Sequence, residues 1–219
     1  PPASASPTNK DLLAAVTFVP DEFVTDYQNL HAADHPDDFK GSSRLFLSLY
    51  QQMSTAPAGK GDTLFLMHGF NYAWADALRE LHRAQRIYCQ PAESPVSQML
   101  MFSWPSHGSL MKYLSDQQIA QPSGALLGRV FGKAVRFHHE FFAPAGGRPA
   151  FCGRKLHLAA HSMGNQVLQE FIRSIRDYQF LRSGIFGETL LLNADADWTA
   201  LEPGQPLHLL PEYAQRIHV

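Results

Sequence analysis

Short apolar runs alternate along the chain with longer stretches in which apolar residues recur at helical intervals. Residues 63–70, TLFLMHGF, contain a continuous apolar run, which is typical of a strand buried on both faces of a parallel sheet. Helical spacing starts at Asn71, a residue type that favours the N-cap position, and is stopped by Pro91. The pattern predicts strands at residues 11–19, 42–50, 63–70, 97–104, 156–160, 188–193 and 214–219, and helices at residues 71–90, 123–142 and 165–178.

This order of elements indicates a fold class. Strands that alternate with helices through short connectors predict an α/β fold with a mostly parallel central sheet and helices on both faces. Residues 42–50 are interpreted as a strand because their three leucines alternate and would lie on one face. The length of 219 residues fits a single domain at residues 11–219, behind a flexible tail rich in Pro and Ser at residues 1–10.

Charge and apolar runs argue against two kinds of partner. The 18 basic and 20 acidic residues leave a formal net charge of -2, and no basic block is present that would attract a nucleic-acid backbone. No apolar run approaches the roughly 20 residues that a transmembrane helix needs. We therefore expect neither a nucleic-acid partner nor a transmembrane segment.

Cysteine usage bears on the compartment. Cys89 and Cys152 are the two cysteines of the chain, and they lie far apart and outside any C-x-x-C spacing. This is typical of a reducing compartment and argues against a thiolate zinc site, so we expect a cytoplasmic protein. The chain starts with Pro1, which is compatible with the removal of a leader or an upstream segment.

A polar cluster in the first quarter of the chain contains residue types that bind metal ions. Its members are His31, Asp34, His35, Asp37 and Asp38. No regular element is predicted there that would fix the geometry of the ligands. We interpret the cluster as a solvated loop and expect no metal site.

A lone serine stands where a predicted strand meets a predicted helix. Residues 160–164 read Ala-His-Ser-Met-Gly. Small residues on both sides permit a tight, strained turn that holds the serine hydroxyl above the sheet at a helix N-terminus, as in a nucleophile elbow. We therefore predict that Ser162 is a catalytic nucleophile. The alternative is a helix-capping serine without chemistry.

An earlier strand end supports the same chemistry. The sequence His-Gly-Phe ends the apolar stretch at residues 63–70. The backbone N–H of Phe70, together with the N–H of Met163, would form an oxyanion hole that stabilises a tetrahedral intermediate. Gly69 would let the backbone come close to that intermediate.

Four residues are expected to line a substrate pocket at the same edge of the sheet. In a parallel sheet, reactive groups collect at the carboxyl ends of the strands, where the loops gather. His68 and Gly69 follow one such strand, and Trp104 and Ser106 follow another. The alternative is an ordinary loop with Trp104 packed beneath it.

Four segments carry a recognisable combination of motifs, namely FLMHGFNYAWADALR, FSWPSHGSLMKYLSD, HLAAHSMGNQVL and LLNADADW. In this order they resemble an uncharacterised bacterial branch of the α/β-hydrolase superfamily, which is related to esterases and lipases. The resemblance covers residues 63–219. It implies an α/β-hydrolase fold and a serine hydrolase whose triad follows the chain order Ser, acid, His. It implies no particular substrate, because a fold does not determine a function.

The chain departs from the family pattern at the catalytic base. In hydrolases of this fold the histidine follows the eighth strand, whereas this chain stops at Val219, inside the predicted seventh strand. We therefore expect the last strand and the catalytic histidine beyond Val219. The alternatives within the chain are His208, in a loop, and His218, in a strand.

The acid has a local candidate. Asp195 and Asp197 directly follow the predicted sixth strand, and Asp195 is nearer to its end. A carboxylate there could orient the histidine and stabilise its charged form. The competing interpretation places the acid after the seventh strand, with Asp195 as a helix or turn cap.

Together these motifs predict a serine hydrolase that cleaves an ester or a related acyl compound without a metal or an organic cofactor. The substrate would be a small molecule or a lipid ester. Two alternatives remain from the sequence, a non-catalytic binding or interaction domain with a hydrolase-like fold and an acyltransferase that uses the same serine. The sequence does not specify the acyl chain length or the oligomeric state.

Overall fold

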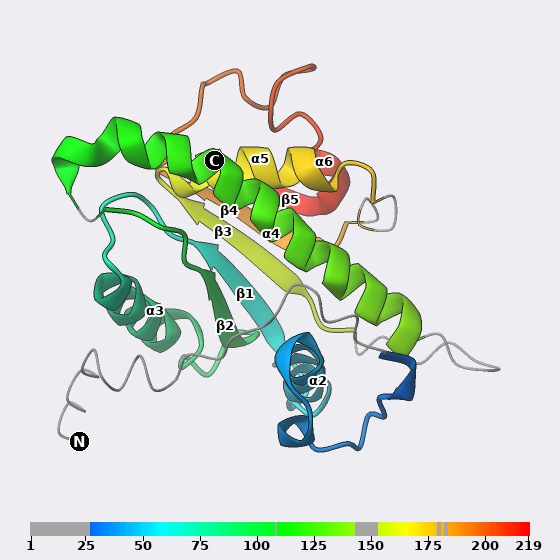
Figure 1. Cartoon of the computed structure of the whole chain (residues 1–219). Coiled ribbons are helices and arrows are strands. Elements are labelled where there is room, and N and C mark those ends of the chain that lie inside the picture. Colours follow the sequence, from blue (N-terminus) through cyan, green and yellow to red (C-terminus); the bar gives the residue numbers. More distant parts are fainter. Residues whose placement is uncertain (1–26, 108, 143–152, 179–180, 182–183) are drawn as a thin grey trace, which may run out of the picture.

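The computed structural model describes residues 27–107, 109–142, 153–178, 181 and 184–219 (Figure 1). The expected tail at residues 1–10 and the expected strand at residues 11–19 lie outside the described residues. Cys152 lies outside them as well.

Five parallel strands form one central sheet. They are β1 (Asp62–Met67), β2 (Val96–Phe102), β3 (Leu156–His161), β4 (Phe186–Leu192) and β5 (Ala214–His218), in the spatial order β2-β1-β3-β4-β5. Every pair of neighbours is parallel, which confirms the expected α/β class. The carboxyl ends of the strands, drawn as arrowheads in Figure 1, therefore meet at one edge of the sheet.

Helices cover both faces of this sheet. The described helices are η1 (Tyr27–Asn29), η2 (Pro36–Asp38), α2 (Gly41–Ser54), α3 (Trp74–Tyr88), η3 (Leu110–Lys112), α4 (Tyr113–Phe141), α5 (Gly164–Ile175) and α6 (Leu210–Tyr213). On one face, Phe65 and Met67 of β1 share a large core with α4 and α5. On the other face, Leu64 packs with Ala84 of α3. Successive side chains of a strand point to opposite faces of the sheet, so Leu64 lies on one face and Phe65 on the other.

Helices α4 and α5 approach each other at two glycines. A Cβ atom at Gly124 would lie 2.4 Å from the carbonyl oxygen of Val167, and one at Gly128 would lie 2.0 Å from Ser174 Oγ. The two glycines are four residues apart and therefore share one face of α4. Because they carry no side chain, α4 can lie directly on α5, across the sheet (Figure 1).

The expected strand at residues 42–50 is wrong, because these residues belong to helix α2. The buried residues of α2 recur with helical spacing, and Leu45 is 45% exposed, so the alternating leucines do not form one buried face. The rings of Phe46, Tyr27 and Phe137 pack together with centroids 5.3–6.1 Å apart. Because Phe137 belongs to α4, this packing stabilises α2 as a helix, which the alternating leucines did not predict.

Helix α3 starts later than expected. Its first residue is Trp74, and its N-cap is Ala73, which makes no side-chain capping hydrogen bond. Asn71 lies before the helix with a φ of 67° and is not the N-cap.

Helix α4 starts earlier than expected, at Tyr113, and runs through Pro122. The sequence predicted that this helix begins at Ser123. A proline inside a helix removes one backbone hydrogen bond and usually ends or kinks the helix. The first turns of α4 are nevertheless helical, since Tyr113 and Asp116 make tertiary contacts that are described below.

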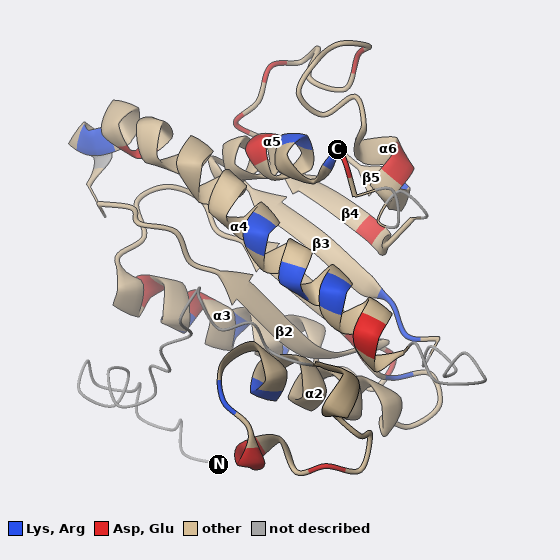
Figure 2. Cartoon of the chain, turned by 45° about the vertical axis from the view of Figure 1, so that its right-hand side comes forward, with Lys and Arg blue, Asp and Glu red and all other residues tan. Residues whose placement is uncertain are grey.

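Charged residues are spread over several elements, as Figure 2 shows. A row of basic residues, Arg129, Lys133 and Arg136, follows one face of α4. The row ends beside Glu140, which accepts a hydrogen bond from Arg136 at 2.5 Å. None of the helices in the described part of the chain is both long and apolar enough to cross a membrane.

The packing of α4 on α5 can be tested with two glycines of the same helix. We expect Gly124→Ala to destabilise the protein by about 1–3 kcal/mol, because the new Cβ would meet backbone atoms of α5. At Gly132 the new Cβ would meet only the side chain of Tyr178, which is exposed and can turn away. There the higher helix propensity of alanine should leave stability unchanged or raise it by up to about 1 kcal/mol. Urea unfolding followed by circular dichroism measures both variants, and equal losses would contradict this packing.

Candidate functional site

The turn between β3 and α5 places Ser162 at the carboxyl edge of the sheet. Ser162 has a φ of 50°, in the left-handed region. Its N–H donates to the carbonyl of Leu192 at 2.9 Å, and its own carbonyl accepts from the backbone N–H of Asn165 at 3.0 Å and that of Asp195 at 3.2 Å. The buried side chain of Asn165 donates to the carbonyls of Ala160 and Ser162 at 3.0 and 2.9 Å. The backbone of the turn is therefore held from several sides.

Left-handed backbone at non-glycine residues is concentrated at this edge. Among the described residues, the non-glycine residues with positive φ are Asn71, Ser162 and Asn193, with values of 67°, 50° and 43°. They follow β1, β3 and β4, which are neighbours in the sheet. Such a conformation costs a non-glycine residue on the order of 1–2 kcal/mol, and strain of this kind clusters at functional sites.

The hydroxyl of Ser162 has no hydrogen-bond partner among the described residues. The side chain is half-buried. The N-cap of α5 is Met163, and no side chain caps that helix. The structure therefore lends no support to the alternative of a helix-capping serine.

Two glycines let the loop after β1 touch this turn. A Cβ atom at Gly164 would lie 2.6 Å from the carbonyl oxygen of Met67, and one at Gly69 would lie 3.0 Å from Ser162 Cβ. The first distance is shorter than real Cβ contacts and the second is tighter than most of them, so a side chain at either position would force its surroundings to shift. The loop that carries Phe70 therefore lies directly against Ser162.

The two N–H groups predicted to stabilise an oxyanion are available. Among the described residues, neither the N–H of Phe70 nor that of Met163 donates to a protein acceptor. Phe70 lies one residue after Gly69, and Met163 directly follows the serine at the start of α5. Unpaired backbone N–H groups at a helix N-terminus favour a negatively charged oxygen nearby.

His68 and Trp104 lie beneath the surface of the site, each with an exposed fraction of 2%. The Trp104 ring stacks on the His68 ring with centroids 5.4 Å apart, and its Nε1 donates to the His68 carbonyl at 2.9 Å. The Trp104 backbone N–H approaches His68 Nε2 at 3.3 Å, so Nε2 is the acceptor and Nδ1 donates to the Gly69 carbonyl at 2.7 Å. Burial lowers the pKa of His68, and the hydrogen bond to Gly69 raises it to a smaller extent. Both side chains support the loop from below, and their expected contact with substrate stays a prediction.

Asp195 lies beside the serine turn. Its Oδ2 accepts hydrogen bonds from the hydroxyl of Tyr113 at 2.6 Å and from Gln166 Nε2 at 3.0 Å. The carboxylate of Asp197 instead accepts from the backbone N–H and the hydroxyl of Thr199, at 2.9 and 2.7 Å. Asp197 is therefore the turn cap, and Asp195 connects the loop after β4 to the first turns of α4 and α5.

Tyr113 also contacts the loop that carries Phe70. The two rings meet edge to face, with centroids 5.2 Å apart. The hydrogen bond to Asp195, with burial and the negative charge as smaller causes, raises the pKa of Tyr113 to about 12. The hydrophobic pattern does not single out Tyr113 or Gln166. The motif segment FSWPSHGSLMKYLSD contains the tyrosine and is the one sequence feature that could have identified it.

A fully buried carboxylate, Asp116, lies one turn further along α4. It accepts from the Ser106 hydroxyl at 2.9 Å, from the His107 backbone N–H at 3.1 Å and from His107 Nδ1. Ser106 was expected to line the substrate pocket, and its hydroxyl also accepts from the backbone N–H of Tyr72 at 3.3 Å. The sequence did not predict a role for Asp116.

No contact among the described residues places either alternative base near the serine. His208 is exposed, and its Nδ1 lies 2.6 Å from the carbonyl oxygen of Gln205. His218 pairs with Glu188, with 2.7 Å between Nε2 and Oε2. Both rings have local partners instead.

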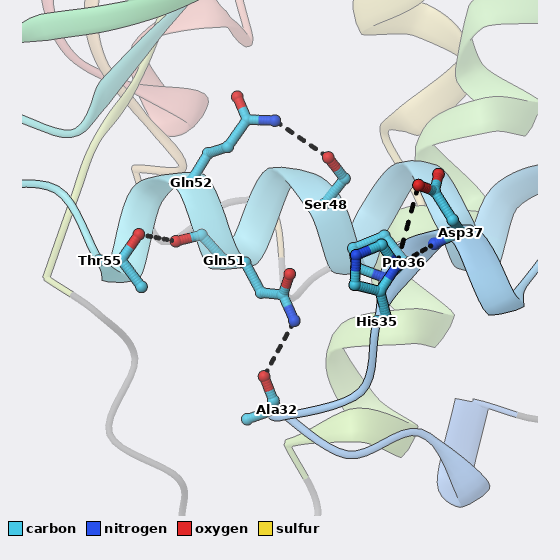
Figure 3. A pocket seen from close by; sticks show the side chains of 8 residues that line it. All are labelled: Ala32, His35, Pro36, Asp37, Ser48, Gln51, Gln52 and Thr55. Atoms are coloured by element: carbon cyan, nitrogen blue, oxygen red, sulfur yellow. Dashed lines mark hydrogen bonds and ion pairs between the residues drawn. The ribbon is translucent and has the colours of Figure 1, made fainter.

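A shallow polar hollow of about 550 Å³ lies between η2 and α2 and includes part of the polar cluster that the sequence marked (Figure 3). His35 Nδ1 accepts from the Asp37 backbone N–H at 3.3 Å, and Asp37 pairs with Arg44 at 2.6 Å. Gln51 donates to the carbonyl of Ala32 at 3.0 Å. In the described part of the chain no three His, Cys, Asp or Glu side chains are arranged to hold a metal ion. The hollow is formed by segments other than the loops that surround Ser162.

Residues 49–202 match the model of a protein family described as "Alpha/beta hydrolase of unknown function (DUF900)". The match covers more than two thirds of the chain and includes Ser162, Asp195 and the loops after β1 and β2. No curated protein and no solved structure matches the chain.

The Tyr113 hydrogen bond can be tested through its pH dependence. The pKa of Tyr113 is raised to about 12 in the folded protein, above the value of about 10 in an unfolded chain. The stabilising effect of Tyr113 relative to Phe should therefore be full below pH 10 and decrease as the pH rises through 10 toward 12. Urea unfolding of the wild type and Tyr113→Phe between pH 8 and about 11 measures this difference. In an Asp195→Asn background the same comparison should lose most of its pH dependence, and an unchanged dependence there would contradict the assigned contact.

Proposed function

Because the chain belongs to the family of α/β hydrolases of unknown function whose model matches residues 49–202, we propose that it is a serine hydrolase acting through Ser162. The substrate is an ester or a related acyl compound. The family supports a hydrolase, and the serine chemistry is argued from the residues of the site.

One observation carries the proposal. Ser162 has a strained backbone at a strand-to-helix turn, and its hydroxyl is not used by any described residue. The unpaired N–H groups of Phe70 and Met163 lie in the two segments that meet at this serine. A free hydroxyl beside available N–H donors is the arrangement that acyl transfer to a serine needs.

The reaction follows from these groups. Ser162 Oγ attacks the carbonyl carbon of the substrate, and its proton passes to a histidine. The N–H groups of Phe70 and Met163 donate to the oxyanion that forms. The histidine then protonates the leaving alcohol, and an acyl-enzyme remains, which water hydrolyses in a second, analogous step. His208 and His218, the two bases considered within the chain, have local partners, so we assign this role to neither of them.

Asp195 is the acid of this proposal. Its Oδ2 is used by Tyr113 and Gln166, and no described residue donates to its Oδ1. A carboxylate held in place by two donors can orient a histidine through its second oxygen and stabilise the imidazolium that forms.

The exposed surface around the site favours an apolar acyl group. Met111, Leu114 and Trp198 are 96%, 72% and 89% exposed. They belong to η3, to the first turn of α4 and to the loop after β4, and the latter two segments also carry Tyr113 and Asp195. Exposed apolar side chains on segments that contribute to the site suit a hydrocarbon chain better than a charged substrate.

Labelling with a fluorophosphonate probe tests the nucleophile. We expect the full-length natural protein to be labelled by the probe and Ser162→Ala to remain unlabelled. The kcat of Ser162→Ala toward p-nitrophenyl butyrate should fall by at least about 10³-fold. Ser97→Ala, an exposed serine of β2, is the matched control and should keep both. A folded wild-type protein that does not react would overturn the serine hydrolase and favour a non-catalytic binding domain. Product analysis with an added alcohol separates hydrolysis from acyl transfer.

The oxyanion loop can be tested at Gly69. Its added Cβ would lie 2.9 Å from His161 Nδ1 and 3.0 Å from Ser162 Cβ, so the loop and the serine turn must shift relative to each other. We expect Gly69→Ala to lower kcat about 10²-fold, because a displaced donor no longer stabilises the transition state. Gly59→Ala, whose Cβ would meet nothing within 4 Å, should leave kcat unchanged. An equal kcat for the wild type and Gly69→Ala would refute the role of this loop.

A further inference from the structure

Asp116 is a buried carboxylate that the reaction described above does not use. Its exposed fraction is 0%, and it lies on the first turns of α4, where an apolar residue would pack at lower cost. Burial alone would raise the pKa of Asp116, but hydrogen bonds from His107 and Ser106 outweigh it and hold the pKa below its usual range. The carboxylate is therefore charged and fully satisfied by the loop after β2. A buried charge with this set of donors indicates a role in holding that loop.

Ser106 relays this contact to a second loop. Its hydroxyl donates to Asp116 Oδ2 at 2.9 Å and accepts from the backbone N–H of Tyr72 at 3.3 Å. Tyr72 lies two residues after Phe70, and Asn71 between them has the left-handed φ of 67°. The hydroxyl thus connects α4 to the segment that carries the proposed oxyanion donor.

The opposite end of that segment is held independently. His68 is buried, stacks on Trp104 and accepts its backbone N–H at 3.3 Å. The segment between His68 and Tyr72 is therefore fixed at both ends by residues of the loop after β2. Gly69, inside it, lies against Ser162.

We propose that Asp116 is a positioning residue for the reaction at Ser162, which acts through the Ser106 hydroxyl on Tyr72 and so determines where the N–H of Phe70 stands. This inference rests on the proposed serine hydrolase activity and adds to it a residue that does not touch the substrate. The imidazole of His107 is a second partner of Asp116, and it is 42% exposed on its side-chain surface. Its hydrogen bonds in the described part of the chain go to Asp116 and not to Tyr72, so it is not part of the same relay.

The relay predicts a change in kcat without a change in KM. Ser106→Ala removes the hydroxyl that reaches Tyr72, and we expect kcat toward p-nitrophenyl butyrate to fall about 10–100-fold, with KM within about twofold of the wild type. Ser106→Thr keeps a hydroxyl and should restore most of the activity. Ser115→Ala, next to Asp116 on α4, is the matched control and should behave as the wild type. Asp116→Asn should lower kcat at least as much as Ser106→Ala, provided that circular dichroism shows it to be folded.

Hydrogen exchange gives a readout that does not depend on turnover. In Ser106→Ala, the backbone amides of residues 68–74 should exchange faster, while those of β3 and α5 keep the wild-type rates.

The inference is overturned if the wild type reacts with fluorophosphonate but Ser106→Ala keeps the wild-type kcat and the wild-type exchange rates. That result would leave the proposed function intact. A raised KM with unchanged kcat would also overturn it, since Ser106 would then contact substrate directly. His107→Ala with a large loss and Ser106→Ala with none would transfer the role to the imidazole. A wild type that is not labelled would instead refute the proposed function itself, and with it a positioning role in catalysis.

Discussion

The site depends on the close approach between the end of β1 and the turn that joins β3 to α5. The two strands are hydrogen-bonded neighbours in the sheet, so the residues that follow them must share the same space. A Cβ atom at Gly164 would lie 2.6 Å from the carbonyl oxygen of Met67, and only glycine avoids that collision. This contact lets α5 begin directly after Ser162 and brings the loop with Phe70 against the serine. Ser162, the N-terminus of α5 and the loop with Phe70 therefore converge because two strands are adjacent.

The first turns of α4 tie the surrounding loops to one another. Tyr113 contacts the loop after β1 through Phe70 and the loop after β4 through Asp195, while Asp116 holds the loop after β2. Helix α4 is in turn anchored on α5 by glycines that allow direct contact. The same helix thus buries the core with its long C-terminal part and organises the site with its first turns. Its internal Pro122 lies between these two parts.

Membership of the α/β-hydrolase family establishes the fold and leaves the substrate open, because the family is itself one of unknown function. The proposed chemistry depends on individual groups of the site. Asp195 and Asp197 are two residues apart, yet Asp197 is occupied by a local turn, and only Asp195 reaches the segments beside Ser162. The sequence favoured Asp195 only because it is nearer to the strand end, and the structure distinguishes the two carboxylates by what each one contacts.

Periodicity and local motifs were sufficient to predict the buried strands, α5 and the position of Ser162 at a turn, since these features depend on residues close together in the chain. The strand predicted at residues 42–50 is a helix because its burial is set by Tyr27 and Phe137, which no local period of two contains. The start of α4 and the role of Asp116 were missed for the same reason. The hydroxyl of Tyr113 meets a carboxylate 82 residues away in sequence, and such a contact can override the tendency of a proline to end a helix. Short-range patterns specify which backbone a segment prefers, whereas the partners of a buried polar side chain exist only once distant segments have packed together.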